Sequence, residues 1–355
     1  MFFFIYIIFI LICAFFWLGT KPFQPRKTKK NVSLSLVVCC KNEEKSLPLL
    51  LSSIEAQIAD IKNIIFANDK SDDLTLDILN SFSEKYANVK VITANGTGKK
   101  NALRQAIQLS DNEYILCIDA DCVVPKNYFL LVNNFLSENQ PDLMIGGVKY
   151  VNTDVLFKKL QALEFSSLIA SGAGAALARF PIMCNGANLA FRREVWQQAQ
   201  NHLFDEELSG DDVFLLHFVK KIKGKIMFLK AKEGFTWTFP ADSCRKFLDQ
   251  RKRWASKSPS YTDWQTILAA ITVFLINLEI ITLGIISVFI PFIKWIFIAM
   301  FCFKIIIDSV LLIPFLIFSD QKKLTPLIPL LSIIYPFYIA VVPVLGIFGK
   351  FGWKN

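Results

Sequence analysis

The sequence has few of the side chains that build zinc sites. It contains 2 His and 8 Cys, and no CxxC pair has a second such pair or spaced His to complete a set of ligands. A structural zinc site needs four ligands at recognisable spacings. We therefore expect no zinc site, and we expect the cysteines to stay reduced in the core or in lipid.

Charged side chains are missing from residues 1–18, which are mainly Phe, Ile and Leu. The charge comes directly afterwards, in the basic residues Lys21, Arg26, Lys27, Lys29 and Lys30. A secretory signal peptide has its basic residues before the apolar run and a small-residue cleavage site behind it, and neither is evident here. We predict a retained membrane anchor at residues 1–20 with a cytosolic basic flank; a cleaved signal peptide is the alternative.

Hydrophobic residues make up 53% of the chain, including 33 Phe, which is more apolar surface than one soluble core can bury. Apolar runs near 266–290, 292–318 and 326–348 each reach the roughly 20 residues that cross a bilayer. We predict three membrane helices in the region 264–349. Residues 31–256 then form a cytosolic domain, and the plasma or inner membrane is the expected location.

The formal net charge of +9 has two interpretations. It can reflect attraction to anionic lipid together with topology signals, or it can serve a phosphate-rich ligand. No stripe of interleaved basic and aromatic residues occurs outside the membrane flanks, so nucleic acid is not an expected partner.

The middle region alternates strand patterns with helical ones. Apolar and β-branched runs predict strands at 33–40, 63–67, 88–93 and 114–118. Helical spacing predicts helices at 47–58, 74–86 and 99–109. Such alternation implies an α/β fold whose mostly parallel sheet has helices on both faces. Ligands of these sheets bind at the carboxyl ends of the strands, so the residues that follow each strand are site candidates.

Three carboxylates directly follow predicted strands. Asp119 and Asp121 flank one small residue after the fourth strand, and two hard oxygen donors there suit a divalent cation that substrate phosphates complete. Asp69 follows the second strand, where a carboxylate can accept hydrogen bonds from a base or a ribose. Each of them alone is also explained as a turn residue or a helix cap.

Three further segments combine small and polar residues. Gly98-Lys99-Lys100 opens a helix after a turn, which suits phosphate binding or leaves a solvated lysine pair. Ser209-Gly210-Asp211-Asp212 precedes a helical pattern, and its carboxylates either favour the helix N-terminus or supply a general base. The turn 185–188 (NGAN) is an ordinary loop or brings backbone close to a sugar.

The segment 250–254 (QRKRW) directly precedes the first C-terminal apolar run. A basic membrane flank with an interfacial Trp is frequent at such a place. The alternative is a site in which Arg253 binds pyrophosphate and Trp254 stacks on a sugar.

Taken in order, these segments resemble the family 2 inverting glycosyltransferases. The resemblance is greatest to the membrane-integrated branch, with cellulose, chitin and hyaluronan synthases and ceramide glucosyltransferases. It covers about residues 33–256 and is carried by VVCCKNEE, FANDKSDDLT, GKKNAL, IDAD, NGANLAFRREVW, SGDD and QRKRW. The sequence departs from the family pattern where the usual DDGSTD reads NDKSDD, at 68–73, and where the ED pair reads Asp211-Asp212.

The resemblance implies a GT-A-type, Rossmann-like fold and a nucleotide-sugar donor, a UDP-sugar above all, with Mg²⁺ or Mn²⁺ as cofactor. Its site residues, carried over one by one, are Asp69, Lys99, Asp119 and Asp121 for the nucleotide sugar, Asp121 also for the metal, Asp212 as catalytic base, and Gln250, Arg253 and Trp254 on the acceptor and pyrophosphate side. The implied acceptor is a polysaccharide or lipid hydroxyl. Processive synthesis and a single addition that forms a glycolipid both stay open, and a non-enzymatic membrane scaffold of the same fold is the remote alternative.

Ionisable residues also occur inside the predicted membrane helices. Lys304 and Asp308 lie four residues apart in the second C-terminal run, and Glu279 lies in the first. Charges at this depth are costly and are usually paired. We favour an internal ion pair that fixes helix packing; the alternative is a polar path for the acceptor.

Overall fold

The computed structural model describes residues 2–25, 32–200 and 210–348, which fall into two compact units. The sheet unit comprises residues 22–149 and 183–239, and the helical unit comprises residues 2–21, 150–182 and 240–348. The helical unit therefore includes two segments, 150–182 and 240–256, that the sequence analysis placed in the domain 31–256.

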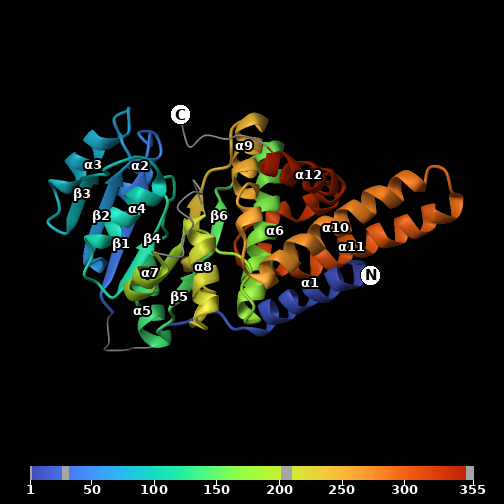
Figure 1. Ribbon diagram of the computed structural model, residues 1–355, viewed down its shortest axis with the longest axis horizontal. Coiled ribbons are helices and arrows are strands. Elements are labelled where there is room, and N and C mark those ends of the chain that lie inside the picture. Colours follow the sequence, from blue (N-terminus) through green and yellow to red (C-terminus); the bar gives the residue numbers. More distant parts are fainter. Residues whose placement is uncertain (1, 26–31, 201–209, 349–355) are drawn as a thin grey trace. The chain divides into compact units, whose positions relative to one another are not determined.

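A seven-stranded sheet is the centre of the sheet unit (Figure 1). The strands of this unit are β1 (Leu34–Cys40), β2 (Asn63–Asn68), β3 (Val89–Thr93), β4 (Tyr114–Cys117), β5 (Leu143–Ile145), β6 (Val148–Tyr150), β7 (Leu189–Arg192), β8 (Ile226–Phe228) and β9 (Thr236–Thr238). The strand order is β3-β2-β1-β4-β7-β5-β8, and β6 pairs with β9 in a separate two-stranded sheet. Only β7 runs antiparallel to its neighbours among these described strands of the large sheet, so the sheet is mostly parallel, as predicted.

Helices accompany the strands of the sheet unit. They are α2 (Leu47–Glu55), α3 (Thr75–Ser83), α4 (Lys99–Gln108), α5 (Tyr128–Asn139), α7 (Arg193–Ala199) and α8 (Asp211–Lys221), with short 3₁₀ turns at Ile58–Asp60 and Lys232–Gly234. The strand β1 is buried almost along its whole length, and Leu36 and Val38 are fully enclosed. Parallel strands have such continuous apolar runs because helices cover both faces of the sheet.

The register of the parallel strands brings their carboxyl ends to one edge. Cys40 at the end of β1 pairs with Asn68 at the end of β2, and Asn68 pairs with Thr93 at the end of β3. Val37 of β1 pairs with Cys117, the last residue of β4. The segments that leave β2, β3 and β4 therefore begin at the same edge of the sheet, which is where the sequence places its candidate site residues.

The helical unit contains the apolar helices predicted at both ends of the chain. Its helices are α1 (Phe2–Gly19), α6 (Leu156–Leu177), α9 (Cys244–Ala255), α10 (Trp264–Ile286), α11 (Pro291–Phe318) and α12 (Ile328–Phe348), with 3₁₀ turns at Ser258–Ser260 and Lys322–Leu327. Four segments of the described chain are long and apolar enough to cross a membrane: Phe2–Gly19, Trp264–Ile286, Pro291–Phe318 and Lys322–Gly346. The basic residues at 26–30 and the tail beyond 348 lie outside the described residues.

The helix α6 is an element that the sequence analysis did not anticipate. It packs against α1 and α11, and a Cβ atom on Gly174 would lie only 2.6 Å from the Cβ atom of Cys13. Its hydrophobic residues do not follow one clear stripe, because buried Gln161, Glu164 and Ser166 interrupt them. These polar residues find their partners inside the helical unit, which local sequence patterns cannot indicate.

The charges in the second C-terminal span form the predicted internal ion pair. Lys304 Nζ lies 2.5 Å from Asp308 Oδ2, and the hydroxyl of Tyr6 on α1 donates a hydrogen bond of 2.6 Å to Asp308 Oδ1. Lys304 is only 3% exposed. The pair therefore links α1 to α11 within the helical unit and satisfies two charges that would be costly if they were separate.

Replacement of Lys304 alone should destabilise the protein far more than replacement of both partners. Lys304→Leu leaves Asp308, whose side chain is 18% exposed, charged without its cation, and breaking a buried pair costs up to about 3–5 kcal/mol. The double variant Lys304→Leu/Asp308→Leu leaves no charge behind and should lose much less. Thermal unfolding in detergent measures both, and equal losses from the single and double variants would contradict the ion-pair account.

Candidate active site

Two helices of the sheet unit begin with a glycine in a left-handed conformation. Gly98 precedes α4 with a φ angle of 101°, and Gly210 precedes α8 with a φ angle of 106°. Side chains other than glycine adopt this region only with strain. The two glycines thus let the chain turn sharply and open α4 with Lys99 and Lys100, and α8 with Asp211 and Asp212.

Asp69 fixes the turn that leads into α4. Its side chain is 1% exposed, and its Oδ1 accepts a hydrogen bond of 2.8 Å from the backbone N–H of Gly98. Its Oδ2 is buried and has no hydrogen-bond partner among the described residues. A buried acceptor without a partner is costly, and a base N–H or a ribose hydroxyl would satisfy it.

Lys99 and Asp119 form an ion pair at the carboxyl edge of the sheet. Burial alone would lower the pKa of Lys99, but the negative charge of Asp119, with smaller contributions from Cys39 and Asp212, raises that pKa above its ordinary value. Lys99 is therefore a permanent cation. It lies in direct contact with one of the two predicted metal and nucleotide carboxylates.

Lys100 forms a second, longer ion pair that the sequence analysis missed. Its Nζ lies 3.9 Å from Asp211 Oδ1, with the two side chains 13% and 11% exposed, and it also lies 5.4 Å from the ring centre of Phe214. The first two residues of α4 thus each face a carboxylate from a distant part of the chain. The sequence contained a signal for this second ion pair, because two lysines are adjacent and two acidic segments, 119–121 and 211–212, were predicted to lie in the site.

Asp212 is held by backbone donors. Its Oδ2 accepts a hydrogen bond of 3.1 Å from the N–H of Gly186, and its Oδ1 accepts one of 2.9 Å from the N–H of Val213. A Cβ atom placed on Gly186 would lie 3.8 Å from Asp212 Oδ2 and 3.9 Å from Lys99 Nζ. Asp212 and Lys99 therefore approach the same small space, while Ser209 lies outside the described residues.

The turn 185–188 divides its residues between the site and the core. Gly186 supports Asp212 through its backbone N–H. Asn188 is fully buried, accepts a hydrogen bond of 2.7 Å from the Tyr128 hydroxyl, and donates to the carbonyl oxygens of Gly147 and Gly234. Asn188 therefore has a structural role, because its side-chain oxygen and nitrogen both form hydrogen bonds within the protein.

The thiol of Cys39 lies among several of the charged groups at this edge of the sheet. Burial is the main cause that raises its pKa to about 12; the charge of Lys99 opposes this increase, and the charges of Asp211, Asp119 and Asp69 add to it. The thiol is therefore protonated at neutral pH and a poor nucleophile. Three carboxylates from separate segments act on this one side chain, so they share one neighbourhood.

A divalent cation fits the donor atoms that are present. Asp121 Oδ1 lies 3.8 Å from the thiol of Cys122, which donates to it, and Asp119 keeps 35% of its side chain exposed. Among residues 2–25, 32–200 and 210–348, no group of three or more His, Cys, Asp or Glu is arranged to hold a metal alone. Two carboxylates suit a Mg²⁺ or Mn²⁺ ion whose other ligands are substrate phosphate oxygens and water.

The three residues predicted for the acceptor side lie on α9, in the helical unit. Gln250 Oε1 accepts hydrogen bonds from the Tyr150 hydroxyl at 3.4 Å and from Arg251 Nη1 at 2.7 Å. The Trp254 ring lies 5.9 Å from that of Phe165, centre to centre. The sheet unit thus brings together Asp69, Lys99, Asp119 and Asp212, and Gln250, Arg253 and Trp254 belong to the other unit.

Part of the chain matches a known family. Residues 35–198 match the family model for Glycosyl transferase family 2, in agreement with the sequence resemblance. The poly-beta-1,6-N-acetyl-D-glucosamine synthases of Staphylococcus aureus and Staphylococcus epidermidis are similar in sequence. The former is 28% identical over 137 residues, which are 38% of this chain and 33% of the relative, and the latter is 28% identical over 161 residues, which are 44% and 39%. The matches thus span between a third and two fifths of these curated relatives.

A solved structure supports the fold over nearly the whole chain. The mannosyltransferase PcManGT from Pyrobaculum calidifontis, in complex with GDP-Man and Mn²⁺, is similar with a TM-score of 0.50 and 13% identity. The likeness covers 93% of this chain and 94% of that one. At this identity it carries the fold alone, and the predicted GT-A-type fold is confirmed.

Asp69→Asn should weaken nucleotide binding without unfolding the protein. The amide oxygen can still accept the hydrogen bond from Gly98, but the amide nitrogen cannot replace Oδ2 as an acceptor. Loss of a hydrogen bond to a charged group costs about 1.5–3 kcal/mol, so the Kd of UDP should rise roughly 10- to 100-fold. Titration calorimetry measures it, with Asp77→Asn on the exposed side of α3 as the control. Unchanged affinity in Asp69→Asn would refute the assignment.

Proposed function

We propose that this chain is a membrane-bound inverting glycosyltransferase that moves a sugar from a nucleotide sugar to a polysaccharide or lipid hydroxyl. The observation that carries the proposal is the convergence of Asp69, Lys99, Asp119 and Asp212 at the carboxyl edge of the sheet. The family 2 domain over residues 35–198 and the four apolar helices support the same assignment. The catalytic domain is proposed to be cytosolic, at the plasma or inner membrane.

The donor is proposed to bind along this edge. Asp69 Oδ2 accepts a hydrogen bond from the base or the ribose, and Lys99 contributes positive charge beside the diphosphate. Asp121, with Asp119, would hold a Mg²⁺ or Mn²⁺ ion, which supplies further positive charge for the leaving group when bound. The mannosyltransferase of the same fold was solved with GDP-Man and Mn²⁺, so GDP-sugars belong in a donor screen beside UDP-sugars.

The reaction is a single in-line displacement. The acceptor oxygen forms a bond to the anomeric carbon as the bond from that carbon to the diphosphate oxygen breaks, and the diphosphate leaves with the electron pair. Asp212 Oδ accepts the proton of the acceptor hydroxyl. Because the acceptor oxygen attacks from the side opposite the diphosphate, the configuration at the anomeric carbon inverts. The N–H groups of Gly186 and Val213 hold the Asp212 carboxylate in one orientation for this transfer.

The acceptor has two candidates, each with its own support. The similar staphylococcal proteins are named poly-beta-1,6-N-acetyl-D-glucosamine synthases, which favours a growing polysaccharide and a UDP-linked N-acetylhexosamine donor. The described residues contain three C-terminal spans, fewer than we expect around a polymer channel, which favours a single addition to a lipid. We prefer the polysaccharide. A non-enzymatic scaffold is the weaker alternative, because the described site keeps its carboxylates and its lysine together.

Asp212→Asn should retain donor binding and lose turnover. An amide cannot accept the acceptor proton, and loss of a general base typically lowers the rate about 10²-fold or more. Release of the nucleoside diphosphate in the presence of acceptor measures turnover, and UDP titration measures binding. Asp111→Asn, an exposed carboxylate of the same unit, is the matched control. Near-wild-type turnover in Asp212→Asn would remove this residue from the mechanism.

Sizing of the products separates the two acceptors. Purified protein in lipid is incubated with radiolabelled UDP-N-acetylglucosamine, UDP-glucose or GDP-mannose, and the products are resolved by size and by extraction into organic solvent. We expect a ladder of polymers with the first donor. One labelled glycolipid would favour the single addition instead, and no product with any nucleotide sugar would contradict the proposed function.

A further inference from the structure

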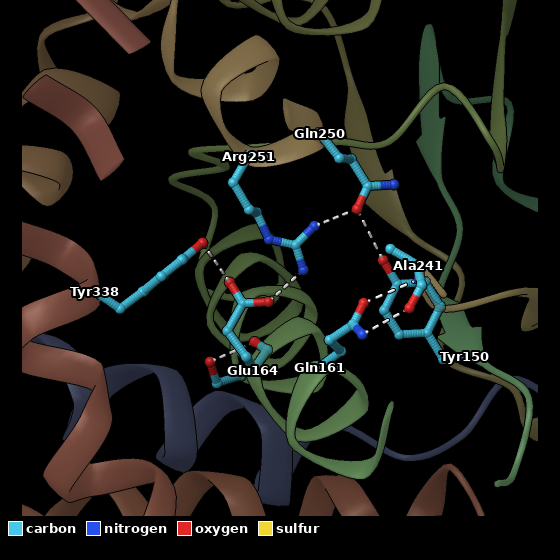
Figure 2. A network of polar contacts seen from close by, with 8 residues as sticks. Tyr150, Gln161, Glu164, Ala241, Gln250, Arg251 and Tyr338 are labelled. Atoms are coloured by element: carbon cyan, nitrogen blue, oxygen red, sulfur yellow. Dashed lines mark hydrogen bonds and ion pairs between the residues drawn. The ribbon is translucent and has the colours of Figure 1, made fainter. Parts of the chain in front are cut away.

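Arg251 is the buried residue of the segment 250–254. Its side chain is 2% exposed and forms an ion pair through Nη2 with Glu164 Oε2 on α6, where the Glu164 side chain is 5% exposed (Figure 2). Burial alone would lower the pKa of Arg251, but the charge of Glu164, with smaller contributions from Tyr150 and Tyr338, raises that pKa above its ordinary value. The family resemblance assigned roles to Gln250, Arg253 and Trp254, and gave none to Arg251 or Glu164.

The guanidinium of Arg251 contacts two of the three residues predicted for the acceptor side. Nη1 donates a hydrogen bond of 2.7 Å to Gln250 Oε1, so one planar group joins Glu164 to Gln250. The guanidinium carbon also lies 4.2 Å from the ring centre of Trp254 and 4.7 Å from that of Phe247. A guanidinium over an aromatic face is attractive and fixes the orientation of the ring.

Glu164 is in turn held by the last apolar helix. The Tyr338 hydroxyl on α12 donates a hydrogen bond of 3.2 Å to Glu164 Oε1 (Figure 2). The helices α9 and α12 pack closely, because a Cβ atom on Gly346 would lie only 2.6 Å from the Cβ atom of Ala255. The chain of contacts therefore runs from α12 through Glu164 and Arg251 to Gln250 and Trp254.

The start of α9 is fixed by a second buried side chain of α6. Gln161 is 2% exposed and exchanges two hydrogen bonds of 2.9 Å with the backbone of Ala241, as Figure 2 shows. This clamp holds the chain before α9 whatever the charge state of the ion pair. A change at Arg251 should therefore alter the orientation of side chains on α9 more than the position of the helix.

A buried ion pair adds little net free energy to the packing of two helices. Desolvation of two charges offsets most of their attraction, and apolar side chains of similar size are often as stable or more so. The Nε of Arg251 is in addition buried with no hydrogen-bond partner among the described residues. Stability alone is a weak reason for such a group, whereas its geometry sets the positions of Gln250 and Trp254 directly.

We propose that Glu164 and Arg251 are positioning residues that orient Gln250 and Trp254 for the acceptor, and that Tyr338 couples this arrangement to the last membrane helix. The inference rests on the proposed glycosyltransferase function. It assigns Glu164, Arg251 and Tyr338 to acceptor binding, so changes at these three residues should affect sugar transfer and leave hydrolysis of the donor by water unchanged.

Arg251→Lys tests the proposal. A lysine keeps a cation beside Glu164, but it has no guanidinium group that can pair with Glu164 and donate to Gln250 at the same time, and no planar group that can stack on the Trp254 ring. We measure the ratio of sugar transfer to donor hydrolysis, the KM for the acceptor, and the melting temperature. We expect the ratio of transfer to hydrolysis to fall about tenfold, because the loss of one well-placed hydrogen bond to a charged group has an effect of this size. The KM for the acceptor should rise, and the rate of donor hydrolysis should not change. Asp242→Asn, which breaks the exposed ion pair to Lys158 on the same helix α6, is the control and should change none of these.

A double-mutant cycle separates positioning from general stability. Arg251→Lys and Trp254→Phe should be strongly non-additive in the ratio, because the first acts through the second. Additive effects would overturn the proposal, and so would an equal loss of transfer and hydrolysis.

If Arg251→Lys unfolds, Tyr338→Phe takes its place, since it removes a single hydroxyl. This variant should lower the ratio of transfer to hydrolysis roughly two- to threefold, as loss of a neutral hydrogen bond does. An unchanged ratio in Tyr338→Phe would then overturn the proposal. If the wild type neither transfers nor hydrolyses any nucleotide sugar, it is the proposed function that has failed.

Discussion

Negative charge is concentrated at one edge of the seven-stranded sheet, and the two lysines that open α4 offset part of it. Lys99 pairs with Asp119 after β4, and Lys100 faces Asp211 at the start of α8. Without these cations, carboxylates from three separate segments would repel one another in a partly buried space. Because Asp69 fixes Gly98, the residue just before Lys99, the position of both ammonium groups depends on the same turn. The site is therefore pre-formed by electrostatic pairing rather than by packing alone.

This arrangement also explains how one edge can receive a highly charged ligand. A nucleoside diphosphate and a divalent cation bring charges that nearly cancel, so they can enter without a large change in the net charge of the site. In the proposed function, the ion pair of Lys99 with Asp119 keeps the proposed ligand of the cation and the proposed counter-ion of the phosphate in contact before the donor binds. Asp212 lies near this pair, but backbone N–H groups orient its carboxylate. Backbone donors therefore hold Asp212, whereas an ion pair holds Asp119.

The helical unit follows a different principle, in which charges are buried within apolar surroundings. Two ion pairs recur there, Lys304 with Asp308 and Arg251 with Glu164, and a tyrosine hydroxyl donates to the acid of each. In a largely apolar environment such pairs specify which helices meet and in which register, because any other arrangement leaves a charge without its partner. Helices with uniformly apolar surfaces contain little information of that kind by themselves.

Much of this could be predicted from the sequence, because the relevant signals are local. The strands β1 to β4, the helix α4 and the apolar spans follow from periodicity and from turn residues within a few positions of each element. The site residues Asp69, Asp119 and Asp212 could be proposed since they follow strands or open a helix. The helix α6 and the partners of Glu164 and Arg251 could not, because their contacts join residues 87 apart in sequence and depend on tertiary packing. Lys100 was within reach of the same reasoning that selected Lys99, but only the fold shows which carboxylate faces it.

The central claim is that the carboxyl edge of the sheet binds the nucleoside diphosphate of the donor. The most direct measurement is an experimental structure of the protein with UDP and Mn²⁺, in which anomalous scattering locates the manganese. The account predicts manganese at Asp121, the diphosphate beside Lys99, and the base or ribose against Oδ2 of Asp69. Nucleotide and metal bound elsewhere, with this edge unchanged and Asp69 Oδ2 still without a partner, would contradict it.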